Sequence, residues 1–154
     1  MRIRLLPLLL VVGLIAGCGG GDDSPEPATT PSGTRAATSE DLAGRGFVAR
    51  SVDGYELVAD TQISLEFGNN SLSVSAGCNS TSGKYEVKGG ELQFKPGPST
   101  LMGCPEDLLD QDKWLNDFLE SRPVATTDDG DLALTGTGDV TIKLEDSTGK
   151  PAGS

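Results

Sequence analysis

The sequence predicts a mainly β fold of the α+β class: a small antiparallel sheet of about seven or eight strands, curled or barrel-like, with one α-helix packed on it. Apolar and polar residues alternate along most of residues 41–146, which is typical of strands with one buried face. Residues 105–120 show helical spacing instead. Glycine is abundant, with 21 residues, and only 5% of residues are aromatic, which favours a small fold rich in turns.

Three hairpins and one earlier strand account for most of the predicted sheet. The hairpins join residues 63–67 to 72–76, 85–87 to 92–94, and 132–134 to 140–144. Each pair of alternating runs is separated by a short segment containing glycine, which is a typical hairpin signal. The earlier strand is expected around residues 47–52.

The stretch from Pro105 to Glu120 is predicted to be the helix. Its apolar positions at helical spacing are Leu108, Leu115, Phe118 and Leu119, with Trp114 at their flank. Pro105 suits the first turn, and Glu106 and Asp107 suit the positive N-terminal end. Pro123 follows and cannot continue a helix.

Residues 1–17 have the features of an export signal peptide. Arg2 and Arg4 precede an apolar run from Leu5 to Ile15, and small residues follow. A membrane-spanning helix needs about 20 apolar residues, and this run is too short. We therefore expect a removable signal.

The end of that run, Ile15-Ala16-Gly17-Cys18, resembles the lipobox of bacterial lipoproteins. The resemblance implies cleavage before Cys18 and attachment of a lipid with fatty acyl chains such as palmitate to its sulfur. Two or more acyl chains hold a protein stably on a bilayer. The expected location is the extracytoplasmic face of the cell membrane; secretion without a lipid, with Cys18 free or paired, is the alternative.

Composition divides the rest of the chain. After Cys18, residues 19–40 lack Leu, Ile, Val, Met and aromatic residues and are rich in Gly, Pro, Ser and Thr. Segment 18–40 is therefore expected to be a lipidated cysteine followed by a disordered linker. One folded domain is expected at 41–146, and the polar tail 147–154 is expected to be disordered.

The charge balance and the absence of histidine restrict the function classes. The net charge of −11 opposes binding to nucleic acid or to anionic lipid. Histidine, the commonest general base and metal ligand, does not occur. We expect no enzyme activity, no catalytic residue, no cofactor and no metal. The acidic segment 128–131 is interpreted as a hairpin turn and not as a calcium site.

Cys78 and Cys104 remain once Cys18 is assigned to the lipid. An even number of cysteines in an oxidising compartment favours pairing, so a Cys78–Cys104 disulfide is expected. Two free structural thiols are the main alternative. A nucleophilic cysteine would need a base, and a zinc site would need about four ligands, so both are weaker interpretations.

Several short motifs occur together in order. They are Gly77-Cys78-Asn79, Gly83-Lys84-Tyr85, Ser99 to Cys104 before the helix, and a late Leu132-Ala133-Leu134 strand. Together they resemble the META domain, the HslJ-like family of bacterial envelope proteins, over residues 42–146. Family members usually have a tryptophan in the first strand, where this chain has Phe47.

The resemblance implies structural roles for the motif residues. Asn79 and Gly83 are expected to adopt turn conformations. Tyr85 is expected to lie in the core with its hydroxyl at the rim, and Met102 is expected to fill a gap in the packing. The family has no established catalytic residues to carry over.

The resemblance also implies a non-enzymatic binding or structural role in the envelope, with a link to heat-shock induction and antibiotic tolerance. The expected partners are the membrane, through the lipid, and an unidentified envelope protein or ligand. Two alternatives stay open: a small lipoprotein inhibitor of a hydrolase such as lysozyme or a protease, and a hydrolase that uses paired carboxylates.

Overall fold

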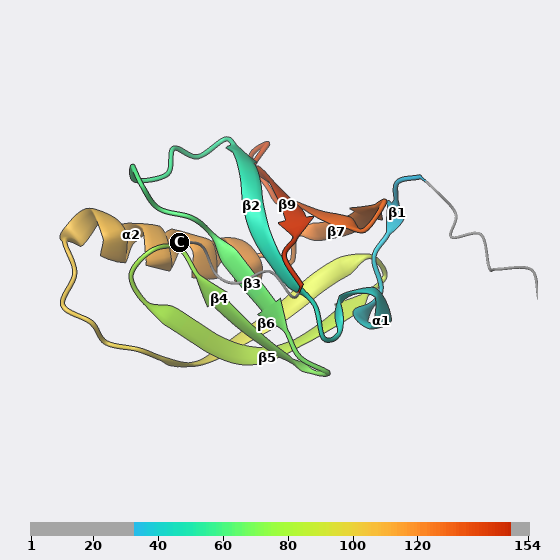
Figure 1. Ribbon diagram of the computed structural model, residues 1–154, viewed down its shortest axis with the longest axis horizontal. Coiled ribbons are helices and arrows are strands. Elements are labelled where there is room, and N and C mark those ends of the chain that lie inside the picture. Colours follow the sequence, from blue (N-terminus) through green and yellow to red (C-terminus); the bar gives the residue numbers. More distant parts are fainter. Residues whose placement is uncertain (1–32, 149–154) are drawn as a thin grey trace, which may run out of the picture. The chain divides into compact units, whose positions relative to one another are not determined.

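The computed structural model of the chain describes residues 33–148, which form an eight-stranded antiparallel barrel with one additional strand and two helices (Figure 1). The strands are β1 (Arg35–Ala36), β2 (Gly46–Asp53), β3 (Ser64–Phe67), β4 (Ser71–Ser75), β5 (Ser80–Lys88), β6 (Glu91–Ser99), β7 (Val124–Asp128), β8 (Asp131–Thr135) and β9 (Thr141–Asp146). The helices are α1 (Ser39–Leu42) and α2 (Glu106–Glu120). The predicted fold class is confirmed.

The strand order around the barrel is β7-β6-β5-β4-β3-β2-β9-β8, and β8 pairs with β7 to close it. All pairings are antiparallel, and β2–β9 joins the two ends of the folded chain. The junction of β6 and β7 is short, with one residue pair, Glu91 with Val124. β1 pairs with the other end of β7.

The three predicted hairpins and the early strand are present, and two strands were not predicted. β7 was missed because its inward residues are only Ala125 and Thr127, so its apolar alternation is weak. β1 has two residues, too few for any pattern. The β5–β6 hairpin is longer than predicted and extends to Ser80 and Ser99.

The core is formed by the inward residues of the strands and one face of α2. Phe47 is fully buried and packs edge-on against Phe67, with ring centroids 5.7 Å apart. The Arg45 guanidinium lies 4.8 Å from the centroid of the Phe47 ring. Tyr85 is buried, and its hydroxyl donates a hydrogen bond to the Gly68 carbonyl at 3.1 Å, at the rim as expected.

Helix α2 packs against β6 and two loops. Its buried residues are Gln111, Leu115, Phe118 and Leu119, whereas Leu108 is only partly buried. A Cβ at Gly136 would lie 2.5 Å from the Phe118 ring, so glycine permits this close approach. Trp114 stacks on Tyr55 at 3.6 Å and thereby joins the helix to the loop after β2.

The folded chain begins earlier than the sequence analysis expected, because β1 and the start of α1 lie within the expected linker. Thr38 and Asp41 form a capping box at α1, and Arg35 pairs with Asp41 at 2.6 Å. At the other end, the Ser147 amide donates to the Gly46 carbonyl. The expected signal peptide, Cys18 and most of the linker and tail lie outside the described residues.

Neither helix in the described range is long and apolar enough to cross a membrane.

Candidate functional site

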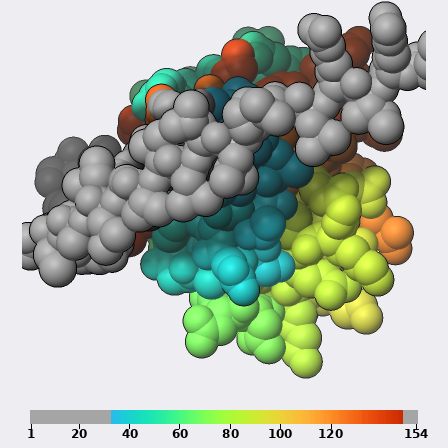
Figure 2. Space-filling model, turned by 90° about the vertical axis from the view of Figure 1, so that its right-hand side faces the viewer, coloured from blue at the N-terminus to red at the C-terminus, as the bar shows by residue number. Residues whose placement is uncertain are grey.

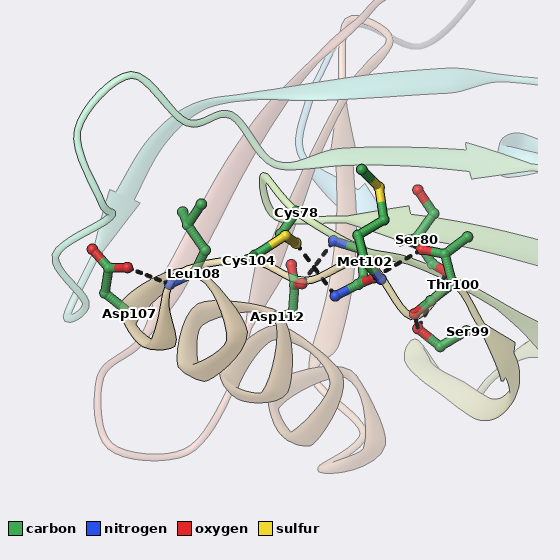
Figure 3. Close-up of a disulfide and its surroundings, with 10 residues drawn as sticks. Cys78, Ser80, Ser99, Thr100, Met102, Cys104, Asp107, Leu108 and Asp112 are labelled. Atoms are coloured by element: carbon green, nitrogen blue, oxygen red, sulfur yellow. Dashed lines mark hydrogen bonds between the residues drawn. A yellow bond between two sulfur atoms is a disulfide. The ribbon is translucent and has the colours of Figure 1, made fainter.

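Cys78 and Cys104 are joined by a disulfide, with Cα atoms 6.4 Å apart (Figure 3). Cys78 follows β4, and Cys104 lies just before α2, 26 residues further along the chain. The bond therefore ties the segment that enters the helix to the barrel. A bonded sulfur is neither a nucleophile nor a thiolate ligand, so in this state neither cysteine performs such chemistry.

Asn79 fixes the segment that follows β6. Its side chain is nearly buried, and its Oδ1 accepts hydrogen bonds from the Thr100 hydroxyl at 3.0 Å and the Met102 amide at 2.9 Å. Its own backbone amide donates to the Asp112 carboxylate of α2 at 2.7 Å. Asn79 thus connects strand, loop and helix. From the sequence alone, Asn79 was expected to serve only as a turn residue.

Thr100 extends the pairing of β5 with β6 by one step. Its amide donates to the Ser80 carbonyl at 3.0 Å, and the Ser80 amide donates to the Thr100 hydroxyl at the same distance. The hydroxyl of Thr81 donates to that of Ser99 at 3.2 Å. Both ends of the segment Thr100–Cys104, the braced loop, are therefore held.

The braced loop exposes its two large apolar side chains. Leu101 is 96% exposed and Met102 is 62% exposed. The expectation that Met102 fills a gap in the packing is wrong. The loop is positioned by its polar backbone contacts and the disulfide, so its apolar side chains are not needed to hold it in place.

Acidic residues follow the braced loop directly. Glu106, Asp107 and Asp110 are exposed in the first turns of α2. Asp107 accepts a hydrogen bond from the Leu108 amide at 2.9 Å, which stabilises the start of the helix. The loop thus presents an apolar pair next to a negative surface.

The titrating groups with displaced pKa values serve structure. The hydrogen bond from Arg35 holds the pKa of Asp41 well below its usual range, since it outweighs the effect of burial. Burial raises the pKa of Tyr85. Within residues 33–148, no group of three or more Cys, Asp or Glu side chains is placed to hold a metal ion. The acidic segment 128–131 forms the β7–β8 turn, with Asp129 and Gly130 at positive φ.

The protein is a small barrel domain. Its antiparallel barrel is closed, one helix packs on it, and a disulfide braces the loop before that helix. The META domain family model matches residues 40–148, well over half of the chain, and the chain belongs to this family. The META domain is not known as an enzyme family.

Two solved structures share the fold. The solution structure of a protein from Burkholderia xenovorans has a TM-score of 0.59 and 21% identity; the match covers 81% of this chain and 97% of that one. A second solution structure has a TM-score of 0.54 and 24% identity; the match covers 71% of this chain and 94% of that one. Among curated proteins, the comparison finds no match.

Proposed function

We propose that this chain is a lipid-anchored, non-enzymatic binding module of the cell envelope, and that it binds a protein partner through the braced loop. One observation carries the proposal: Leu101 and Met102 stay exposed on a loop that is fixed at both ends. Exposed apolar side chains grouped on a surface are typical of interaction sites. A loop already held in one conformation loses little entropy on binding.

The surroundings of the loop indicate the chemistry of the partner. Glu106, Asp107 and Asp110 follow the apolar pair, so the complementary surface is an apolar pocket with lysine or arginine at its rim. Such a partner is attracted by the acidic chain as a whole, whose net charge is −11.

The lipobox-like residues Ile15–Cys18 support the anchor and the extracytoplasmic location. The composition of the linker supports a tether that gives the domain freedom to reach its partner. Membership of the META family supports a role in the envelope, and we place that role in stress or antibiotic tolerance.

Site-specific photo-crosslinking tests the binding surface. A photoreactive amino acid replaces Leu101 in the full chain in cells, and the same substitution at Val124, 48% exposed on β7, is the control. We expect one recurrent protein crosslinked from position 101 and none from 124. The purified partner should bind the Leu101→Ser/Met102→Ser variant at least tenfold more weakly, and added salt should weaken its binding to the parent chain.

Unchanged affinity of the double variant would refute the braced loop as the binding surface. Crosslinks from position 101 to lipid alone would also contradict a protein partner.

The intact mass of the mature chain, measured with and without reductant, tests the anchor and the disulfide separately. We expect a mass that includes a diacylglyceryl group, lost in Cys18→Ala, and a gain of two hydrogens on reduction. An unmodified mass would contradict the anchor without affecting the loop.

A second candidate is inhibition of an envelope hydrolase. The favouring observation is the same rigid loop, because an exposed segment braced by a disulfide suits insertion into a cleft. A stoichiometric complex with lysozyme or a secreted protease, lost in Leu101→Ser/Met102→Ser, would support it.

The structure does not favour hydrolysis by paired carboxylates. One surface groove includes Glu86 and Glu120, but both side chains are exposed. A carboxyl that acts as general acid is normally shielded from water or placed against a second carboxylate.

A further inference from the structure

A groove of about 560 Å³, lined by charged, amide and ring-bearing side chains, lies between the β5–β6 hairpin and the C-terminal end of α2. This volume is within the range of roughly 300–1,000 Å³ typical of ligand sites. Lys84 and Lys95 come from the outer face of the hairpin, and Arg122 follows the helix. Figure 2 shows the yellow-green surface of the hairpin on the side of the molecule that faces the viewer.

The basic side chains of this groove differ from most others in the domain. Arg35, Arg45, Arg50, Lys113 and Lys143 each form an ion pair with an acidic residue. Among residues 33–148, only Lys84, Lys88, Lys95 and Arg122 form none, and three of these four line the groove. Unpaired cations gathered in one place are unexpected in so acidic a chain, because acidic residues outnumber basic ones about two to one.

The arrangement of these cations opposes stability. Lys84 and Lys95 are directly opposite each other in the β5–β6 register. Like charges at opposed positions of an antiparallel pair are destabilising. Arg122 directly follows the C-cap Ser121 and has φ 61°, a left-handed conformation in which helices commonly end. A pair of opposed lysines kept at a groove despite its cost in stability favours a binding function.

We infer that this groove binds a sugar that bears a carboxylate. Lys84, Lys95 and Arg122 supply charge-assisted hydrogen bonds for the carboxylate. Asn70 and Gln93 also line the groove, and amides both donate to and accept from hydroxyl groups. Two exposed glutamates of the groove, Glu86 and Glu120, accept hydrogen bonds only, so they favour a ligand that also carries hydroxyl donors.

A hydroxyl-rich acid offers a carboxylate to the cations and hydroxyl groups to the amides and glutamates, whereas inorganic phosphate offers only a compact anion. Such a carboxylate occurs in hexuronic acids and in the lactyl group of muramic acid. The inference goes beyond the proposed function, since it involves none of the residues of the braced loop.

Titration calorimetry on the full chain in detergent tests the inference with four probes. Digalacturonic acid and the disaccharide of N-acetylglucosamine and N-acetylmuramic acid carry the carboxylate in its two forms. Diacetylchitobiose is the neutral control, and inorganic phosphate is the control for a bare anion. We expect saturable binding of at least one acidic sugar, which identifies the source of the carboxylate, and at least tenfold weaker binding of both controls.

The variant Lys84→Gln/Lys95→Gln should bind that acidic sugar at least tenfold more weakly. Its unfolding midpoint should not fall, because both side chains are exposed and unpaired. Lys88→Gln is the matched control, since Lys88 is an exposed, unpaired lysine of β5 outside the lining, and it should leave affinity unchanged.

Absence of saturable binding by both acidic sugars would overturn the inference. Equal binding of phosphate or of the neutral sugar, or equal loss in Lys88→Gln, would also overturn it.

Discussion

At the scale of single residues, Asn79 carries more of the local structure than its motif suggested. One side-chain oxygen accepts from both Thr100 and Met102, and the backbone amide contacts α2. A buried acceptor with two donors is costly to replace, because both donors lose their partner. Asn79 therefore determines where Leu101 and Met102 are presented.

Replacing Asn79 with alanine should lower the free energy of unfolding by about 1–3 kcal/mol, since the Met102 amide and the Thr100 hydroxyl lose their acceptor. Urea denaturation measures the change. Asn69→Ala, at an exposed turn position, should stay within about 0.5 kcal/mol of the parent. Equal stability of the two variants would show that Asn79 does not anchor the loop.

Asp146 makes stability depend on pH at the acid end. Burial raises its pKa, but hydrogen bonds from Thr148 and Arg45 outweigh burial and lower the pKa to about 2, from 3.8. A carboxylate with a lowered pKa in the folded state stabilises the protein above the unfolded value. That stabilisation is complete above about pH 5 and is lost as pH falls towards 2.

Asp146→Asn should therefore lower stability by up to about 1 kcal/mol at neutral pH and reduce the loss of stability between about pH 5 and pH 2. Urea denaturation at several pH values measures both effects. Asp139→Asn, at an exposed turn, is the control. An unchanged acid dependence in Asp146→Asn would contradict the role of the Arg45 and Thr148 contacts.

At the scale of elements, α2 is attached to the barrel by a buried polar contact as well as by its apolar face. The Gln111 amide donates to the Ala76 carbonyl and, at 2.9 Å, to the Thr61 hydroxyl. Its carbonyl accepts from the Val58 amide at 2.6 Å. Gln111 thus satisfies backbone groups of two loops that have no strand partner.

Gln111→Leu should lower the free energy of unfolding by about 2–4 kcal/mol, because the buried Ala76 carbonyl and the partly buried Val58 amide lose their partner. Chemical denaturation followed by Trp114 fluorescence would measure it. Lys113→Gln, which removes only an exposed pair with Asp117, should cost about 0.5 kcal/mol or less. A loss no larger than that of the control would mean that the loops do not depend on Gln111.

At the scale of the whole domain, the barrel has one weak junction. β6 and β7 share one residue pair and two flanking hydrogen bonds, from Leu92 to Pro123 at 2.9 Å and from Ala125 to Gly90 at 2.7 Å. The β5–β6 pairing extends along most of both strands. Local opening should begin where few hydrogen bonds must break together.

Hydrogen exchange of the native domain should show earlier exchange at the amides of Leu92 and Ala125 than at the centre of β5. Both residues are fully buried, so slow exchange is expected if burial alone controls exchange. Early exchange is expected if the small number of hydrogen bonds at the junction controls it. Equal protection of the junction and of β5 would show that the barrel opens only as a whole.

The sequence allowed the fold class to be predicted because each hairpin joins neighbouring segments whose alternation is visible in a short window. β7 could not be predicted in this way, since Ala125 and Thr127 give little contrast with their polar neighbours. The capping box at Thr38 was a readable signal that α1 begins before residue 41. Met102 was predicted wrongly, because an apolar side chain usually indicates burial, whereas the structure exposes this one.

By itself, the sequence determined the hairpins, the helix and the two cysteines available for pairing, because these follow from local periodicity and from residue counts. Only the tertiary structure decided that β2 meets β9, that Asn79 fixes an exposed apolar loop, and that Lys84, Lys95 and Arg122 gather at one groove. Contacts between residues far apart in the chain depend on the summed packing of the barrel, which no short window of sequence contains.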